Sequence, residues 1–348
     1  MSPISQPEAS VEEQPTISYT KKDFMSDQTI RWCPGCGDYS ILSQVQTVFA
    51  ELGVPRERFA VISGIGCSSR FPYYMNTFGF HTIHGRAPAF ATGLKLVNPS
   101  LDVWQITGDG DALSIGGNHF IHVLRRNVDM VLMLFNNRIY GLTKGQYSPT
   151  SEEGKKTKST PMGSVDHPFE PCALALGAEA TFVARTVDVF TTEQRDVLRA
   201  AHTHKGTSFV EIWQNCNIFN DGAFADITDK KARSEKVLFV EHGKPLTFGT
   251  EAAPKGLRLT AGLSLEVIDV TDDTIGQVLV HDETSPVLGM LLSRLKPPFP
   301  VAMGVLHRVS RPLYEEGVHH QLDVAHARPG AADLRKALLG ASPWTVGA

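Results

Sequence analysis

Two stretches decide the fold: Val-Trp-Gln-Ile-Thr-Gly-Asp-Gly-Asp at residues 103–111 and Val-Leu-Met-Leu-Phe-Asn-Asn at residues 131–137. In each, a short and largely apolar run ends in polar residues. Such runs are typical of buried strands in a parallel sheet that helices cover on both faces. Open α/β sheets bind ligands at the carboxyl ends of their strands. We therefore expect an α/β fold in which Asp109 and Asn137 share one ligand site.

The surrounding sequence extends this pattern. Residues 114–126 are predicted to form a helix, because apolar residues recur along one side. Further strands are expected at residues 59–63, 179–184 and 208–213, and a further helix at 191–204. The predicted core is thus one parallel sheet with helices on both faces, followed by a C-terminal extension.

The spacing of Asp109 and Asn137 resembles the thiamine diphosphate and magnesium signature of thiamine-dependent enzymes. Magnesium prefers octahedral oxygen ligands with one or two carboxylates. Asp109, the Asn137 amide oxygen and the Ile139 carbonyl would leave room for diphosphate oxygens and a water. Gly108 and Gly110 would let the backbone approach the phosphates, and the helix that follows would offer its N-terminal amides.

Two other interpretations of the glycine motif were weighed. A dinucleotide fingerprint would need a third Gly or Ala where this chain has Leu113. The simplest alternative is an ordinary glycine turn followed by an unrelated pair of asparagines. The thiamine interpretation is favoured because both motifs follow predicted strands.

The cysteines supply a second signal. Cys33 and Cys36 form a C-x-x-C motif, Cys67 follows the strand expected at 59–63, and Cys216 follows the strand expected at 208–213. Cys172 lies in an Ala- and Leu-rich stretch and is expected in the core. Four thiolates can hold zinc or a four-iron cluster, and their spacing alone does not choose between them. Because Cys67 should lie beside the diphosphate site, we favour an iron–sulfur cluster, which could exchange electrons with thiamine.

With both signatures in view, most of residues 25–230 resembles the β subunit of the 2-oxoacid:ferredoxin oxidoreductases. The matching strings are Trp32-Cys33-Pro34-Gly35-Cys36-Gly37, Gly64-Ile65-Gly66-Cys67-Ser68, His81-Thr82-Ile83-His84-Gly85-Arg86, Gly108-Asp109-Gly110-Asp111, Ile115-Gly116-Gly117-Asn118-His119 and the run from Asn136 to Gln146.

The resemblance implies a role for each site residue. A [4Fe–4S] cluster would be ligated by Cys33, Cys36, Cys67 and Cys216, and Mg²⁺ by Asp109, Asn137 and the Ile139 carbonyl. Thiamine diphosphate would be lined by Ile65, Gly66, Cys67, Ser68, His84, Gly108, Asp109, Gly110, Asp111, Asn137, Ile139, Tyr140, Gly141 and Leu142. The catalytic candidates are Leu142, packed near the thiazolium, and the basic residues Arg70 and Lys144, which could meet a substrate carboxylate. A solvated loop lysine is the alternative for Lys144.

The implied reaction is the reversible oxidative decarboxylation of a 2-oxoacid with coenzyme A, with electrons passing through the cluster to ferredoxin. Arg70 and Lys144 favour a dicarboxylate, so 2-oxoglutarate is expected to give succinyl-CoA and CO₂. Pyruvate or another 2-oxoacid is the alternative substrate. A thiamine-dependent decarboxylase or lipoamide-linked dehydrogenase subunit, and a zinc-stabilised non-catalytic subunit, are the rival functions.

The resemblance also implies a partner. Thiamine enzymes need a carboxylate, usually Glu, at the aminopyrimidine, and this chain shows no second domain to supply it. We therefore expect an α subunit that carries the Glu, in an αβ or (αβ)₂ assembly. The expected organisation is a disordered lead at 1–24, a thiamine diphosphate, magnesium and cluster domain at 25–230, and an extension at 231–348 that contacts the core and the partner.

Other features limit the possible functions. A net charge of −4 and the lack of a long basic stretch argue against nucleic acid as a partner. No uncharged apolar stretch is long enough to cross a membrane, and no signal peptide is recognised, so a cytoplasmic location is expected. Residues 146–165 are expected to form a mobile loop. Its lysines, Lys155, Lys156 and Lys158, are predicted to be a solvated cluster, with coenzyme A phosphates as the alternative, and His319-His320 is predicted to be a surface pair.

Overall fold

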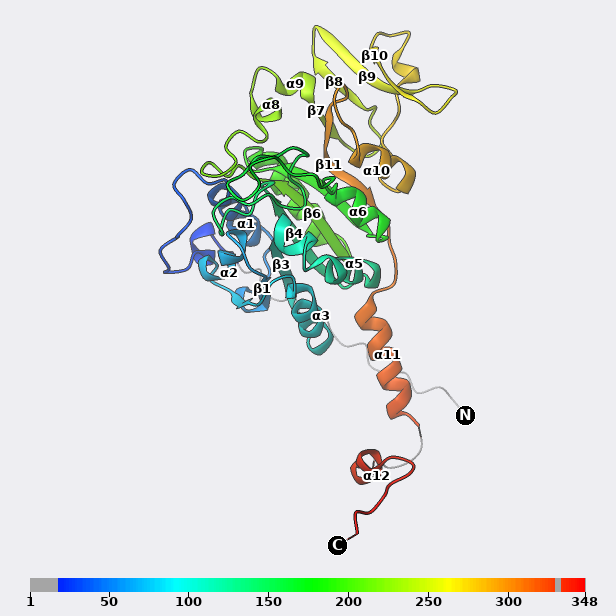
Figure 1. The fold of residues 1–348 in the computed structure, drawn as a ribbon. Helices are drawn as coiled ribbons and strands as arrows, with labels where there is room; N and C mark the ends of the chain where they lie inside the picture. The colour runs from blue at the N-terminus through cyan, green and yellow to red at the C-terminus, as the bar shows by residue number, and fades with distance from the viewer. Residues whose placement is uncertain (1–17, 329–332, 348) are drawn as a thin grey trace, which may run out of the picture.

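A computed structural model describes residues 18–328 and 333–347 and is built around one eight-stranded sheet (Figure 1). The strands lie in the order β2-β1-β3-β4-β6-β5-β11-β7. Their bounds are β1 Phe59–Ser63, β2 Phe78–His81, β3 Asp102–Gly108, β4 Met130–Asn136, β5 Phe182–Val187, β6 Thr207–Trp213, β7 Val237–Val240 and β11 Val301–Arg308.

The six strands from β2 to β5 run parallel to one another, which confirms the predicted parallel sheet. The C-terminal region then continues the same sheet. Strand β11 pairs antiparallel with β5, and β7 pairs parallel with β11. The expected boundary at residue 230 therefore does not coincide with an edge of the sheet, because the later part of the chain supplies its last two strands.

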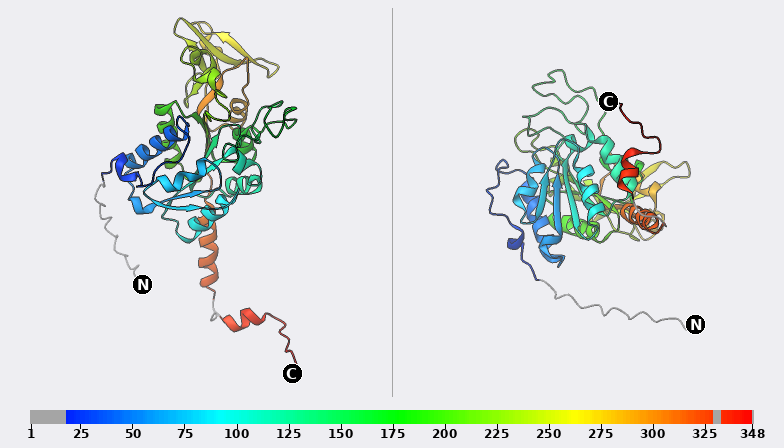
Figure 2. Two further views of the ribbon diagram at one scale, coloured as in Figure 1. Left: turned by 60° about the vertical axis from the view of Figure 1, so that its left-hand side comes forward. Right: turned by 90° about the horizontal axis from the view of Figure 1, so that it is seen from below.

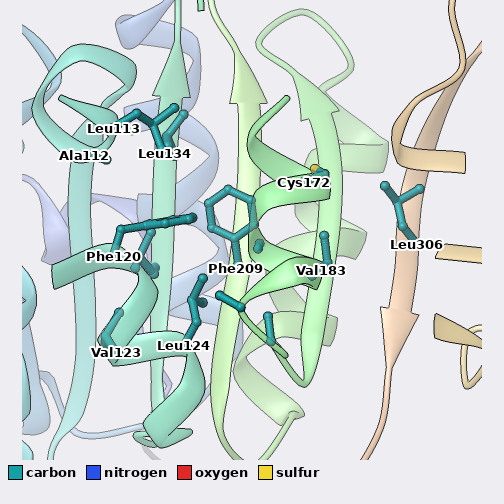
Figure 3. Close-up of a cluster of buried hydrophobic side chains, with 14 of the residues drawn as sticks. Ala112, Leu113, Phe120, Val123, Leu124, Leu134, Cys172, Val183, Phe209 and Leu306 are labelled. Carbon is teal, nitrogen blue, oxygen red and sulfur yellow. The ribbon is translucent and has the colours of Figure 1, made fainter. Parts of the chain in front are cut away.

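Helices cover both faces of the sheet, as predicted. One face carries α3 (Ala87–Val97), α5 (Gly117–Arg126), α6 (Pro171–Gly177) and α10 (Pro286–Ser293), and the other carries α1 (Asp38–Glu51) and α7 (Thr191–Thr203). Figure 3 shows Phe120, Val123 and Leu124 of α5 facing Phe209 of β6. Removing each such side chain from water contributes about 1.5–3 kcal/mol, so the two faces share the stabilisation of the sheet.

Alternate side chains of β4 pack into the cores on the two faces of the sheet. Leu132 and Leu134 pack into the core under α5, whereas Val131 and Met133 pack into the core under α1 and α7. Successive side chains of a strand point to opposite faces, so a strand buried on both sides must be apolar at every position. The continuous apolar run in the sequence has this cause.

Smaller elements complete the chain. A second sheet of three antiparallel strands comprises β8 (Thr247–Thr250), β9 (Ala253–Leu259) and β10 (Leu265–Asp269). The short helices are η1 Lys21–Phe24, η2 Arg56–Arg58, η3 Ser68–Arg70, α2 Phe71–Tyr74, α4 Asp109–Leu113, α8 Ala225–Thr228, α9 Arg233–Lys236, η4 Ile275–Gln277 and α12 Leu334–Leu339. Helix α11 (Tyr314–His326) projects from the body of the protein (Figure 2). Within residues 18–328 and 333–347, no helix combines the length and apolarity that a bilayer crossing requires.

Three boundaries differ from those predicted. The helix expected from residue 114 begins at Gly117, because residues 109–113 form the separate helix α4 and the chain turns at Ser114. Strand β5 begins at Phe182 rather than 179, since Glu179 adopts a left-handed φ of 61°. The part of the expected lead at residues 1–17 lies outside the described residues. Phe24, at its end, is fully buried against Phe49 and Phe59 and thus belongs to the core.

Candidate active site and cysteine site

A cleft of about 80 Å³ lies where the loops after β1, β2, β3, β4 and β6 meet. Every residue predicted to bind thiamine diphosphate lines it, and these residues lie at the ends of four different strands, β1 to β4, or in the loops that follow them. Four lining residues were not singled out from the sequence: Asp38, Phe135, Thr143 and Gln214. Gln214 directly follows β6, so its place at a strand end is the signal that could have found it.

Asp109 lines this cleft and is buried, with 3% of its surface exposed. Its Oδ2 accepts hydrogen bonds from Ser148 Oγ at 2.5 Å and Thr150 Oγ1 at 2.7 Å. Burial raises the pKa of the carboxyl, although these hydroxyls oppose the shift. A buried carboxylate is costly without a cation, so a metal ion at this position would stabilise its ionised form.

The turn after β4 presents the other predicted metal ligands. Asn137 Oδ1 accepts a hydrogen bond from the Ile139 amide at 3.1 Å. Arg138, between them, has a left-handed φ of 56°, and its guanidinium stacks on Phe224 at 4.6 Å. Its side chain thereby lines a neighbouring cavity rather than the cleft with the predicted thiamine-binding residues, which is called the thiamine cleft below. The carboxylate, the amide oxygen and the carbonyl form a donor set of the kind that Mg²⁺ prefers.

Asp111 connects the loops around the cleft. Its Oδ1 accepts hydrogen bonds from the backbone amides of Ile65 at 3.1 Å and Gly85 at 2.8 Å. Its Oδ2 accepts a hydrogen bond from Thr107 Oγ1 at 2.7 Å. The carboxylate thus joins the loops that follow β1 and β2 to the end of β3, and these contacts orient the walls of the cleft.

A second cavity of about 270 Å³ adjoins the cleft and brings the four cysteines of the sequence motifs together. It is lined by Arg31, Trp32, Cys33, Cys36, Cys67, Arg70, Asn137, Gly141, Leu142, Lys144, Gln214, Cys216, Asn217 and Phe219. Cys172 lies elsewhere: it is fully buried, as expected, and its Sγ lies 3.1 Å from Glu211 Oε2.

Two of these cysteines, Cys36 and Cys67, have thiols with raised pKa values. Burial, followed by the charge of Asp38, raises the pKa of Cys67 to about 12, and the same causes raise the pKa of Cys36. A coordinated cation would reverse this, because metal binding deprotonates thiols outright. Within the described ranges, no three His, Cys, Asp or Glu side chains form a group that could hold one metal ion. Four thiolates around one cavity could hold either a tetrahedral zinc or a four-iron cluster.

The cleft and the cysteine cavity share a wall. Cys67, Asn137, Gly141, Leu142 and Gln214 line both. At Gly141, an added Cβ would lie 3.6 Å from Cys67 Sγ and 3.6 Å from Cys216 Sγ. The cofactor cleft and the candidate cluster position are therefore separated by single side chains.

The two basic candidates for substrate binding lie on the cysteine side of this wall. Arg70 and Lys144 line the cysteine cavity but do not line the thiamine cleft. Arg70 Nη1 donates to the Arg31 carbonyl at 2.7 Å, and Lys144 is exposed. Leu142, which lines both spaces, connects the three catalytic candidates. Contact with a substrate carboxylate stays a prediction for both basic residues.

Residues 146–165 form turns that are tied to the site by hydrogen bonds. Besides Ser148 and Thr150, Ser151 Oγ donates to the Arg138 carbonyl at 2.6 Å. Lys155 is engaged by Glu152 and Asn220, whereas Lys156 and Lys158 are exposed. The expected mobile loop thus has fixed contacts at its base.

The pair His319-His320 lies on α11, far in the sequence from the residues of the two cavities. His319 Nε2 lies 2.8 Å from the Leu96 carbonyl oxygen, and no metal-binding group is found around the pair within the described residues.

Comparison with known proteins identifies the family. Residues 64–212 match the C-terminal TPP-binding domain of thiamine pyrophosphate enzymes. The chain is 54% identical to the 2-oxoglutarate oxidoreductase subunit KorB of Mycobacterium tuberculosis, over 93% of this chain and 88% of that one. It is 48% identical to the β subunit of 2-oxoacid:ferredoxin oxidoreductase 1 of Aeropyrum pernix, over 55% of this chain and 60% of that one. The chain belongs to the 2-oxoacid:ferredoxin oxidoreductase β subunits.

A solved structure supports the same family. The 2-oxoglutarate:ferredoxin oxidoreductase of Magnetococcus marinus, solved with 2-oxoglutarate, coenzyme A and succinyl-CoA bound, matches with a TM-score of 0.74 and 32% identity. The match covers 94% of this chain and 98% of that chain. As a member of this family, the β subunit belongs to a thiamine diphosphate-dependent oxidoreductase, and its designation implies a partner subunit.

Proposed function

We propose that this β subunit works in a 2-oxoglutarate:ferredoxin oxidoreductase. The reaction would convert 2-oxoglutarate and coenzyme A to succinyl-CoA and CO₂, with two electrons passed singly to two ferredoxins. The single observation that carries the proposal is the shared wall between the thiamine cleft and the four-cysteine cavity. A decarboxylase has no need for an electron acceptor beside thiamine, whereas an oxidoreductase does.

Asp109, Asn137 and the Ile139 carbonyl would hold Mg²⁺ and, through it, the cofactor diphosphate. The burial of Asp109 and the oxygen donor set support this assignment. When bound, thiamine diphosphate supplies the electron sink for decarboxylation. The protein's share is to orient the diphosphate through this turn and to exclude water with residues such as Phe135 and Leu142.

Cys33, Cys36, Cys67 and Cys216 would hold a [4Fe–4S] cluster. The convergence of these four residues on one cavity, and the two sulfurs that flank Gly141, support the assignment. Cys33 is exposed, so a cluster here would reach the surface. An external ferredoxin could therefore approach without passing through the thiamine cleft.

The active site would be completed by an α subunit. Among the described residues, no glutamate lines the thiamine cleft, so this part of the chain offers no partner for the aminopyrimidine. Apolar side chains are exposed on β2 and just after it, close in sequence to His84 of the cleft: Phe78 is 61% exposed, Phe80 56% and Ile83 64%. Exposed apolar residues of this kind mark interaction surfaces, which supports docking of the α subunit there in an αβ or (αβ)₂ assembly.

The substrate assignment rests on two observations. The Magnetococcus marinus relative was solved with 2-oxoglutarate, coenzyme A and succinyl-CoA. In this chain, Arg70 and Lys144 lie beside Leu142, where a second carboxylate could be paired. The exposed Lys156 and Lys158 could meet coenzyme A phosphates.

The test is anaerobic co-purification with the α subunit, followed by iron, sulfide and zinc analysis and viologen reduction with individual 2-oxoacids. About four irons per β chain, lost in Cys33→Ala and Cys216→Ala but kept in the control Cys172→Ala, would support the proposal. Faster reduction with pyruvate than with 2-oxoglutarate would overturn the substrate assignment. One zinc and no iron would overturn the electron-transfer function.

A further inference from the structure

Gln214 is the buried polar side chain in the wall between the thiamine cleft and the cysteine cavity. It follows β6 directly, is 1% exposed and lines both spaces. Burying a primary amide is costly unless its donors and acceptor are paired. The hydrogen-bond partners of Gln214 therefore indicate its role.

On one side, Gln214 fixes a predicted metal ligand. Its Oε1 accepts a hydrogen bond from Asn137 Nδ2 at 3.0 Å. With Nδ2 engaged, the amide oxygen Oδ1 of Asn137 points the other way, toward the Ile139 amide at 3.1 Å. Only the oxygen of an amide can bind Mg²⁺. Gln214 thus selects the orientation of Asn137 that a metal site needs.

On the other side, Gln214 contacts a predicted cluster ligand. Its Nε2 donates to Cys36 Sγ at 3.2 Å and to the Asn215 carbonyl at 2.6 Å. Hydrogen bonds to cluster sulfurs stabilise the more negative, reduced state and so raise the reduction potential. The same side chain is therefore bonded to both candidate cofactor sites.

We propose that Gln214 is a positioning residue that couples the thiamine–magnesium site to the iron–sulfur cluster. The inference rests on the proposed function, because it requires both cofactors. A change at one site is transmitted through a single amide: movement of Asn137 shifts Oε1 of Gln214, and the rigid amide group then moves Nε2 relative to Cys36. Coupling of this kind is reciprocal, so each cofactor alters the equilibrium properties of the other site.

Two substitutions separate the two contacts. Gln214→Met keeps the size of the side chain but removes both hydrogen bonds. It should weaken Mg²⁺-dependent thiamine diphosphate binding about tenfold, as expected for loss of one hydrogen bond of about 1.4 kcal/mol, and should lower the cluster reduction potential. Gln214→Glu keeps an acceptor for Asn137 but loses the amide donor to Cys36. It should retain cofactor affinity within about threefold while the potential still falls.

Asn215→Ala is the matched control. Asn215 is the next residue, but its side chain donates to Asp221 at 2.9 Å and lines neither space. Its removal should change neither the cofactor affinity nor the cluster potential. Spectroelectrochemistry measures the cluster reduction potential with and without thiamine diphosphate and Mg²⁺. Simple destabilisation of the fold would not lower this potential consistently, so the measurement separates a positioning role from a structural one.

The outcomes are distinguishable. Wild-type complex without iron, or without Mg²⁺-dependent cofactor binding, would contradict the proposed function itself. If the wild type binds both cofactors, but Gln214→Met leaves the affinity for thiamine diphosphate and the cluster reduction potential unchanged, the proposed coupling is wrong. If Gln214→Met does not assemble, Gln214→Glu decides: an unchanged potential refutes the contact with Cys36. A cofactor-induced shift in the wild-type potential that vanishes in both variants is the expected result.

Discussion

The ring of Tyr140 closes over Gly110, and the Tyr140 hydroxyl donates a hydrogen bond to the Gly110 carbonyl at 3.2 Å. A Cβ on Gly110 would overlap the Tyr140 ring. The glycine motif after β3 and the turn after β4 are therefore packed against each other, and a side chain on Gly110 would push the turn away.

We expect Gly110→Ala to weaken thiamine diphosphate binding by tenfold or more, because over-packing costs about 1–3 kcal/mol. Quenching of intrinsic fluorescence on titration with cofactor and Mg²⁺ measures the affinity. Gly117→Ala is the control, since a Cβ at that position meets nothing within 4 Å. Equal affinities of the two variants would refute this account of the turn.

The hydroxyls of Ser148 and Thr150 couple the 146–165 segment to Asp109. Both bond its Oδ2, which leaves Oδ1 for a metal ion. Removing them with Ser148→Ala and Thr150→Val should lower Mg²⁺ affinity about tenfold or more, because hydrogen bonds to a charged group contribute about 1.5–3 kcal/mol. Isothermal titration with Mg²⁺ at saturating cofactor measures this.

Limited proteolysis provides a second readout for that segment. The double variant should be cut faster within residues 146–165 than the wild type, because the loop loses its anchor. Ser159→Ala is the control, since Ser159 is exposed and its hydroxyl forms a hydrogen bond with Thr157 rather than with Asp109. Cleavage of the double variant at the wild-type rate would show that Asp109 does not anchor the loop.

The buried ion pair of Arg185 and Glu211 stabilises the centre of the sheet. Arg185 Nε lies 2.8 Å from Glu211 Oε2, and each side chain is at most 2% exposed. Burial opposes ionisation of Glu211, yet the Arg185 charge holds its pKa below the usual range. Arg185→Met should cost about 3–5 kcal/mol of unfolding free energy, because it leaves a buried charge unpaired.

Neutralising the partner should then restore stability. The double variant Arg185→Met and Glu211→Gln removes both charges and keeps an acceptor for Asn136 and Trp213, which both donate to Glu211. Urea unfolding of the wild type, the single variant and the double variant gives the three free energies. A double variant no more stable than Arg185→Met would show that charge burial is not the dominant cost.

His204 makes the fold sensitive to acid. Burial lowers its pKa to about 4, and Thr181 Oγ1 lies 2.8 Å from Nε2. The unfolded chain protonates this histidine near pH 6.5 while the folded chain does not, so the unfolded state binds more protons between pH 6.5 and 4. Stability should therefore be lost as pH falls through this window, by up to about 3 kcal/mol from this group.

Comparison with His204→Gln isolates the contribution. The variant should be less stable than the wild type at pH 7.5, but its urea midpoint should depend less on pH between 7.5 and 5. His326→Gln, on the exposed end of α11, is the control and should follow the wild-type profile. Parallel profiles of the wild type and His204→Gln would assign the acid sensitivity to other groups.

The sequence by itself determined the fold class and the strand ends. The runs at 59–63, 103–107 and 131–135 are apolar because both faces of those strands are buried, and this local requirement is readable without coordinates. The glycine, asparagine and cysteine motifs that follow these strands could be predicted to converge, since carboxyl ends of parallel strands share one edge.

Only the tertiary structure showed which other residues lie between those motifs in space. Gln214 carries no motif, and its bonds to Asn137 and Cys36 join residues 77 and 178 positions away in the sequence. The side of the wall on which Arg70 lies, and the entry of β7 and β11 into the sheet, depend in the same way on contacts between distant segments. Periodicity reports whether a face is buried, but not which distant segment buries it, because many partners satisfy the same apolar pattern.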